Sequence, residues 1–255
     1  MHLGRWLLKN LLAGMGIGLL FILVHPREMP QETLYEQQAG EATPLMPPTP
    51  TLPPRRVGIV AGHAGGNDPG AVCPDGVTEV QVNQAVARHV KTLLEGKGFT
   101  VDVLEEFDPR LNGYRALALV SIHADSCTLS PDLSGFKLAV SSALARSGEA
   151  RRLLRATRLK QCLADWYQAE TGLFFHEDTV TPDMTEYHAF EEIHPETPAV
   201  IIEVGFLRGD YDLLVHHPEI PARGIAQGVL CFARTQGWNV LPLPKPTTTP
   251  APNRP

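Results

Sequence analysis

Short apolar runs recur along the middle of this chain, and they alternate with stretches that have a helical pattern. The apolar runs occupy residues 56–61, 99–104, 116–122, 136–140 and 199–204. They are continuous rather than interrupted by polar residues, which is typical of strands covered on both faces. The helical patterns occupy residues 78–95, 149–170 and 220–235. This order predicts a single α/β domain, in which a mostly parallel, twisted sheet is flanked by helices on both faces.

Proline-rich segments bound this unit on both sides. Residues 25–55 and 239–255 contain many prolines and few apolar residues, so we expect a semi-rigid linker before the domain and a disordered Pro/Thr-rich tail after it. The folded unit is therefore predicted to span residues 56–238.

The first 24 residues have the pattern of a membrane-targeting segment. Arg5 and Lys9 precede a charge-free apolar run over residues 11–24, and no small-residue cleavage site follows. With Lys9 reaching toward the lipid headgroups, the segment is long enough to cross a bilayer. We expect residues 1–24 to be a signal anchor, with a cleaved signal peptide as the alternative. The positive charges predict a cytoplasmic N-terminus and an exported domain in the cell envelope, held at the cytoplasmic membrane.

The charge balance argues against a nucleic-acid partner. Lys and Arg number 22 and Asp and Glu 28, so the net charge is −6. Affinity for nucleic acid comes mainly from neutralising phosphates, which an acidic chain does poorly. The four cysteines show no CxxC spacing, which argues against a thiolate zinc finger or a thioredoxin-like redox motif.

Polar side chains stand at the ends of three predicted strands. His63 follows the first strand, His123 the third, and Glu203 lies near the end of the last. Ligands of open α/β sheets bind at the carboxyl ends of the strands, so these side chains can converge. A capping-box pattern over residues 78–81 places Glu79 in the first helical turn, where it can face the same edge.

Each of these residues alone is a weak signal. A single histidine after a strand is more often structural, and a glutamate at a helix start often only complements the helix dipole. Glu203 is more informative, since a carboxylate inside an apolar strand is costly to bury unless it is paired or lies near a metal. Together, two histidines and a carboxylate form a ligand set typical of catalytic zinc, and a further carboxylate could act as general base.

These segments resemble the zinc-dependent N-acetylmuramoyl-L-alanine amidases, cell-wall enzymes with a phosphorylase/hydrolase-like α/β fold. The resemblance covers residues 56–238 and rests on four motifs: GHAGGNDPGA, GVTEVQVN, SIHADS and PAVIIEVGFL. It implies one Zn²⁺ per chain held by His63, Glu79 and His123, with Glu203 as the catalytic glutamate. The family usually has Asp-Pro-Gly-His where residues 60–63 read Val-Ala-Gly-His, and Asn where this chain has Asp125. Neither departure changes a ligand.

The implied reaction is hydrolysis of the amide bond between N-acetylmuramic acid and L-alanine, which makes peptidoglycan the expected partner. The same metal chemistry would serve a zinc peptidase acting on stem peptides. A membrane-tethered module that binds the cell wall without catalysis is the third possibility. The motifs favour the amidase and name no protein activator.

Several residues around the four motifs are secondary candidates. Asn83 lies one helical turn after Glu79 and could orient it. His176, His188 and His194 precede Glu203, and any of them could contact substrate or be structural.

The cysteines leave two possibilities open. If both histidines bind one metal, the loops that carry Cys73 and Cys127 are neighbours, so an exported domain could form a disulfide there. The alternative is two free thiols. Cys162 and Cys231 are expected to pack unpaired in helices.

Overall fold

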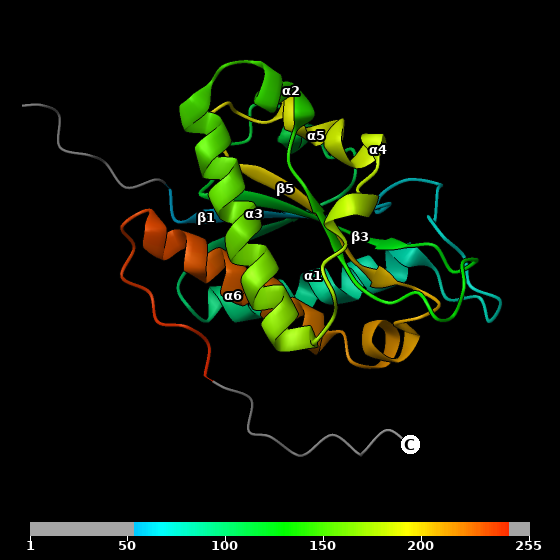
Figure 1. Ribbon diagram of the computed structural model, residues 1–255. Coiled ribbons are helices and arrows are strands. Elements are labelled where there is room, and N and C mark those ends of the chain that lie inside the picture. The colour runs from blue at the N-terminus through cyan, green and yellow to red at the C-terminus, as the bar shows by residue number, and fades with distance from the viewer. Residues whose placement is uncertain (1–53, 245–255) are drawn as a thin grey trace, which may run out of the picture. The chain divides into compact units, whose positions relative to one another are not determined.

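A five-stranded sheet lies at the centre of the molecule (Figure 1). The computed structural model describes residues 54–244. The strand order is β2-β1-β3-β5-β4, and every neighbouring pair is parallel except β4 with β5. The strands are β1 (Arg56–Ala61), β2 (Thr100–Leu104), β3 (Ala118–Asp125), β4 (Lys137–Ala139) and β5 (Ala199–Phe206). The predicted mostly parallel sheet is confirmed, with β4 as its antiparallel edge.

The central pairing brings two candidate site residues side by side. In the register of β3 and β5, Leu119 pairs with Ala199, and His123 pairs with Glu203. A register irregularity follows between His123 and Asp125. Because β3 continues to Asp125, His123 lies within the strand and not just after its end, where it was expected.

Three long helices cover one face of the sheet (Figure 1). They are α1 (Glu79–Glu95), α3 (Ala150–Thr171) and α6 (Glu219–Thr235), and each boundary lies within one residue of its prediction. Glycines allow α3 and α6 to approach closely: a Cβ at Gly224 would lie 2.9 Å from the Cα of Tyr167, and one at Gly228 would lie 2.8 Å from that of Leu163. The close approach explains why glycine occupies these two positions of α6.

The other face of the sheet is covered differently from the prediction. Its apolar residues pack against the loops around Tyr114 and Tyr187 and against short helices, not against a long helix. The short elements on this face are α4 (Pro182–Thr185), α5 (Ala189–Glu192) and the 3₁₀ turn η1 (Pro109–Leu111). The other short elements are α2 (Ser142–Arg146), the 3₁₀ turn η2 (Glu177–Thr179) and the π-helical turn η3 (Asp212–His216), which packs on the opposite face next to α6. Helical periodicity did not reveal them because each spans only one or two turns.

The chain extends beyond the described residues at both ends. The proposed anchor over residues 1–24 and nearly all of the linker lie outside the described residues, as does the chain after residue 244. Within residues 54–244, no helix combines the length and apolar character of a membrane span. The folded part continues past residue 238, where the tail was expected to begin: Val240 and Leu243 are buried, and the Leu243 amide donates to Gln227 Oε1 at 3.0 Å.

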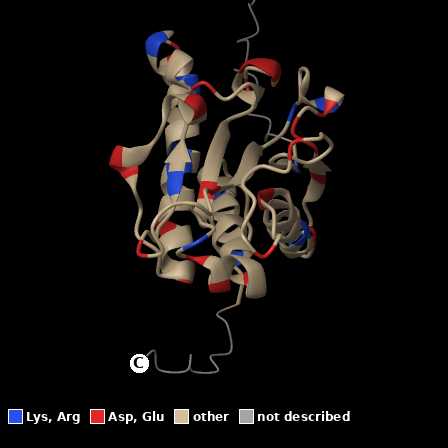
Figure 2. Ribbon diagram, turned by 90° about the vertical axis from the view of Figure 1, so that its right-hand side faces the viewer, with Lys and Arg blue, Asp and Glu red and all other residues tan. Residues whose placement is uncertain are grey.

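Charged residues of both signs are interspersed over the elements in Figure 2, with no single basic face in that view. This distribution agrees with the net charge of −6 for the whole sequence.

Candidate metal centre

His63 lies just after β1 in a conformation that a non-glycine residue rarely adopts. Its φ is +62°, in the left-handed region, and its amide donates to Glu106 Oε2 at 2.8 Å. The preceding Gly62 allows the turn to pass over the His123 ring, since a Cβ at Gly62 would lie 2.4 Å from His123 Cε1. Strained backbone of this kind concentrates at functional sites, because surrounding contacts must hold it in place.

Glu79 begins α1, and its carboxylate is held by hydrogen bonds. The capping box formed by Thr78 and Gln81 fixes the helix start as predicted. The amides of Ala71 and Ala124 donate to the Glu79 carboxylate at 3.0 and 3.1 Å. Burial by itself would raise the pKa of Glu79, but the hydrogen bonds from His123, His63 and the two amides outweigh burial and hold the pKa well below its ordinary value. The carboxylate is therefore ionised.

Asn83 makes the contact expected of a residue that orients Glu79. Its Nδ2 group donates to the Gly62 carbonyl at 3.1 Å and to Glu79 Oε1 at 3.3 Å. Asn83 is fully buried one helical turn after Glu79. It thereby connects the loop that carries His63 to the helix that carries Glu79.

His123 brings the third donor to the same point. Its Nδ1 lies 3.3 Å from Glu79 Oε1, and His63 Nε2 lies at the same distance from that oxygen. Burial by itself would lower the pKa of His123, but the facing carboxylates of Glu106 and Glu79 raise it to about 10 in the metal-free protein. A metal ion can bind only deprotonated imidazole, so metal binding here would release a proton.

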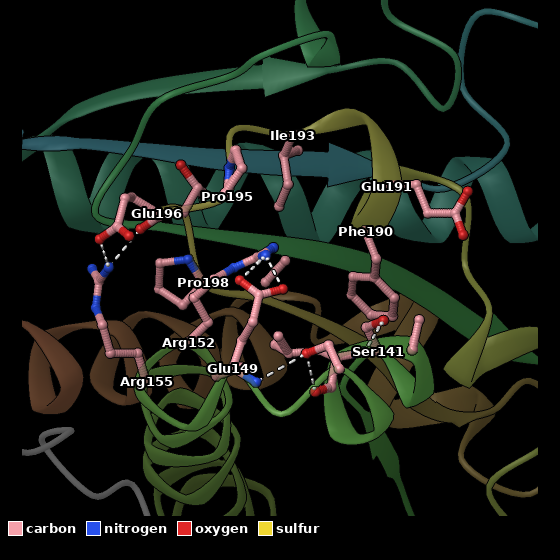
Figure 3. Close-up of a pocket in the computed structure, with 16 residues that line it drawn as sticks. Ser141, Glu149, Arg152, Arg155, Phe190, Glu191, Ile193, Pro195, Glu196 and Pro198 are labelled. Carbon is pink, nitrogen blue, oxygen red and sulfur yellow. Dashed lines mark hydrogen bonds and ion pairs between the residues drawn. The ribbon is translucent and has the colours of Figure 1, made fainter.

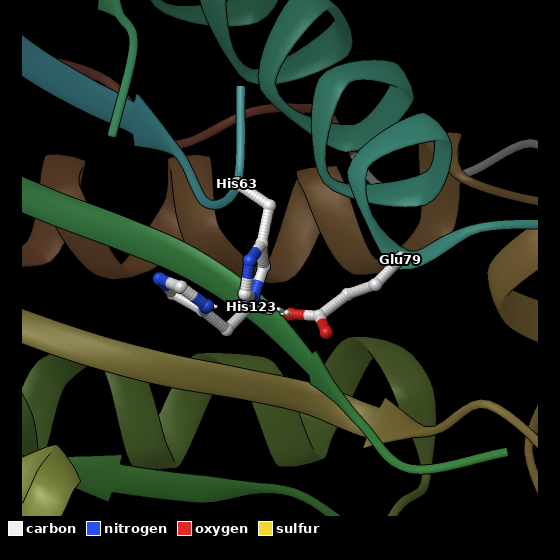
Figure 4. Close-up of side chains that lie close together, drawn as sticks. All are labelled: His63, Glu79 and His123. Carbon is white, nitrogen blue, oxygen red and sulfur yellow. Dashed lines mark hydrogen bonds and ion pairs between the residues drawn. The ribbon is translucent and has the colours of Figure 1, made fainter. Parts of the chain in front are cut away.

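The three predicted ligands meet in one cluster. His63, Glu79 and His123 each offer one ligand atom, and these atoms lie within 4.8 Å of one another (Figure 4). Two imidazole nitrogens and one carboxylate oxygen are a donor set that zinc accepts, and three protein ligands leave a position free for water or substrate. The residues present therefore fit a catalytic metal ion.

Glu203 faces the same open pocket, whose volume is about 670 Å³. Its Oε2 atom is buried and has no hydrogen-bond partner within the described part of the chain. Burial raises the pKa of Glu203 to about 7, although the positive charge of His123 opposes this effect. A carboxyl group with a pKa near neutrality is suited to accept and return a proton.

Asp125, which replaces the usual asparagine of the third motif, is ion-paired with Lys137. Lys137 stands opposite Glu203 in the register of β4 and β5. The antiparallel edge strand therefore brings a buried cation next to the site.

Glu106 is a further residue of the site that was not expected from the sequence. It follows β2 by two residues, is 7% exposed, and its Oε2 lies 3.3 Å from His123 Nε2. The rule that found His63, a polar residue just after a strand, also applies to Glu106. Two adjacent glutamates occupy this position, however, and the sequence does not indicate which is buried.

Of the three secondary histidines, one lies at the pocket and two lie elsewhere. His188 lines the pocket, and its Nε2 lies 2.9 Å from Glu106 Oε1. His176 instead contacts the Ser134 carbonyl at 2.8 Å, and His194 Nδ1 accepts from the Glu196 amide at 3.1 Å. Neither His176 nor His194 lines the pocket.

Two disulfides tie the structure together. Cys73 and Cys127 are bonded, with their Cα atoms 5.2 Å apart, so the bridged alternative is the correct one. This bond links the loop between His63 and Glu79 to the segment just after His123. Cys162 and Cys231 lie in helices as expected, but they are not unpaired: a disulfide between them joins α3 to α6 across the close helix contact, with a Cα separation of 5.7 Å.

A second cavity, of about 240 Å³, lies where the chain enters β5 (Figure 3). Its arginines are already partnered: Arg152 pairs with Glu149, and Arg155 donates to the Glu196 carbonyl. None of the four predicted site residues lines this cavity.

The fold and the cluster together define an α/β protein with a candidate metal centre at the carboxyl edge of its sheet. The chain belongs to the N-acetylmuramoyl-L-alanine amidase family, because the model of that family matches residues 57–229. The amidase AmiC of Neisseria meningitidis serogroup B is 35% identical over 106 residues, which cover 38% of this chain. The match spans 25% of the length of AmiC.

Two solved structures share the fold. Ami1, the N-acetylmuramyl-L-alanine amidase from Mycobacterium smegmatis, has a TM-score of 0.56 at 19% identity, over 73% of this chain and 100% of that one. An N-acetylmuramoyl-L-alanine amidase from Clostridium difficile 630 has a TM-score of 0.55 at 21% identity, over 72% and 98%. At these identities the likeness concerns the fold.

Proposed function

We propose that this chain hydrolyses the amide bond between the lactyl group of N-acetylmuramic acid and the L-alanine of the peptidoglycan stem peptide. The observation that carries the proposal is the His63–Glu79–His123 cluster, with Glu203 in the same pocket of an amidase-family domain. A cluster without a nearby proton acceptor could serve structure alone. The Glu203 carboxyl supplies that acceptor, since its Oε2 atom is buried without a hydrogen-bond partner among residues 54–244.

The cofactor in this proposal is one Zn²⁺ per chain, held by His63, Glu79 and His123. When bound, zinc would polarise the scissile carbonyl and lower the pKa of the attacking water. The Glu79 carboxylate is already ionised and held by backbone amides, so it needs little rearrangement to bind the metal ion. Helix α1, the loop after β1 and strand β3 each supply one of the three ligands.

Glu203 carries the proton in the proposed reaction. It accepts a proton from the attacking water and delivers it to the alanine nitrogen as the carbon–nitrogen bond breaks. The products are a free lactyl carboxylate and a stem peptide with an N-terminal amine. The burial that raises the pKa of Glu203 to about 7 favours both halves of this transfer.

We also propose that the domain works outside the cytoplasm, tethered to the cytoplasmic membrane by residues 1–24. Arg5 and Lys9 before the apolar run support this orientation. Two disulfides support an exported domain, because such bonds persist in oxidising compartments. Peptidoglycan lies in the same compartment.

The identity of the products tests the proposed activity. Purified protein would be incubated with purified peptidoglycan, and the released peptides identified by mass spectrometry. An amidase releases intact stem peptides that begin with L-alanine. Shortened peptides would indicate a stem peptidase, and cosedimentation with the wall without any release would indicate a binding module; either result would refute the proposal.

A further inference from the structure

The Glu106 carboxylate lies outside the metal-ligand cluster and contacts three histidines, two of which belong to the cluster. Its Oε2 accepts the His63 backbone amide at 2.8 Å and lies 3.3 Å from His123 Nε2. Its Oε1 lies 2.9 Å from His188 Nε2, and the other ring nitrogen of His188 lies 2.7 Å from Glu192. A buried carboxylate with this many partners has little freedom to move.

The two ring nitrogens of His123 face different carboxylates. Nδ1 faces Glu79 inside the cluster, whereas Nε2 faces Glu106 outside it. Nε2 is buried and its approach to Glu106 lacks hydrogen-bond geometry, so it has no hydrogen-bond partner within the described residues. A neutral imidazole that binds a metal through Nδ1 carries its proton on Nε2. Leaving that proton without an acceptor in a buried site would be costly.

We infer that Glu106 is a positioning residue for the metal centre, which holds His63 through its backbone amide and His123 through Nε2. Carboxylates that accept the second ring proton of a ligand histidine fix its tautomer and orientation and strengthen its binding. The inference rests on the proposed metal site. Beyond that site, it assigns to a single side chain, Glu106, the positioning of two of the three proposed ligands, His63 and His123.

Asp68 shows why burial matters for this role. Its carboxylate lies 3.2 Å from His63 Nδ1, but its side chain is 76% exposed. Water competes for such a contact, so it contributes little. The Glu106 side chain is 9% exposed, and its contacts are correspondingly stronger.

Zinc affinity measured by competition with a chromophoric chelator tests the inference. Glu106→Met keeps the approximate size but removes both acceptors, and we expect its zinc dissociation constant to rise about 10- to 100-fold. Glu106→Gln should recover part of this loss, because its amide oxygen can still accept a hydrogen bond. The matched control is Glu192→Gln, which alters the far end of the same network and should stay within about twofold of wild type.

Thermal unfolding of the metal-free proteins separates positioning from stability, since a merely structural role would lower stability without weakening zinc binding. If the Glu106→Met protein binds zinc as tightly as wild type, the positioning role of Glu106 is overturned, and the proposed cofactor is unaffected. Wild-type protein that binds no zinc would overturn the proposed cofactor as well. If Glu106→Met does not fold, nitrogen-15 NMR of the zinc-loaded wild type decides: we expect the His123 proton on Nε2, and a proton on Nδ1 would overturn the inference.

Discussion

His123 and Glu203 occupy paired positions on neighbouring parallel strands, β3 and β5. Strand pairing therefore fixes the spacing between a candidate metal ligand and the candidate proton acceptor, with no flexible loop between them. The pairing is central in the sheet, where both strands are buried. Sites built on such rigid elements hold their geometry more closely than sites built on loops.

Replacing Glu203 with Gln should separate catalysis from metal binding. The substitution keeps the size of the side chain but removes the proton acceptor. General acid–base catalysis contributes about 10²- to 10⁴-fold, so kcat should fall by at least that range while one zinc per chain remains. Turnover assays and metal analysis on the same protein check this expectation. Near-normal turnover would refute the assigned role.

Replacing His63 or His123 with Ala should have a different signature. Two protein ligands hold a catalytic zinc poorly, so metal and activity should be lost together. Metal content after dialysis and turnover in excess zinc would be compared with those of His194→Ala, a histidine away from the pocket. A histidine variant that keeps one tightly bound zinc would contradict the ligand assignment.

The raised pKa of Glu203 predicts a pH-dependent stability of the metal-free protein. Burial raises this pKa from an ordinary value of 4.5 to about 7, so the folded state binds the proton more tightly than the unfolded state does. The stabilising contribution is present below about pH 4.5 and is lost as pH rises through about 7. Glu203→Gln removes this loss.

Relative to wild type, the free energy of unfolding of Glu203→Gln should therefore increase by about 3 kcal/mol between pH 4 and pH 8, at about 1.4 kcal/mol per pKa unit. Urea unfolding in the presence of chelator measures this difference. A difference that is the same at both pH values would indicate a normal carboxyl pKa.

The four candidate site residues could be predicted because their positions follow from simple geometry. Carboxyl ends of parallel strands share one edge of the sheet, and the capping box fixed the position of Glu79. Glu106 obeyed the same rule but could not be distinguished from its neighbour Glu105. The reversal of β4, which places Lys137 opposite Glu203, depends on tertiary pairing that a three-residue strand does not encode.

The Cys162–Cys231 bond could not be predicted for a similar reason. Whether two cysteines in separate helices pair depends on how the helices pack. The glycines of α6 allow its close contact with α3, but the sequence does not show which helix they face. The Cys73–Cys127 pair was foreseeable as a possibility, because the proposed metal ligands already made its two loops neighbours.

The two disulfides should differ in their effect on the metal centre. Each closes a long loop, with sequence separations of 54 and 69 residues, so replacing either pair with Ser should lower the free energy of unfolding by about 2–5 kcal/mol. Only the Cys73→Ser/Cys127→Ser protein should also bind zinc more weakly, because only this bond joins the segments that carry the ligands. Equal zinc affinity in the two double variants would contradict this expectation.

The central claim is that metal held by His63, Glu79 and His123 enables hydrolysis of the muramoyl–alanine bond. The most direct test is a titration of zinc into chelator-stripped protein, with release of intact stem peptide from a soluble muropeptide as the readout. Activity should be absent without metal and rise linearly to a plateau at one zinc per chain. Full activity in excess chelator, or protein saturated with zinc that releases no intact stem peptide, would contradict the account.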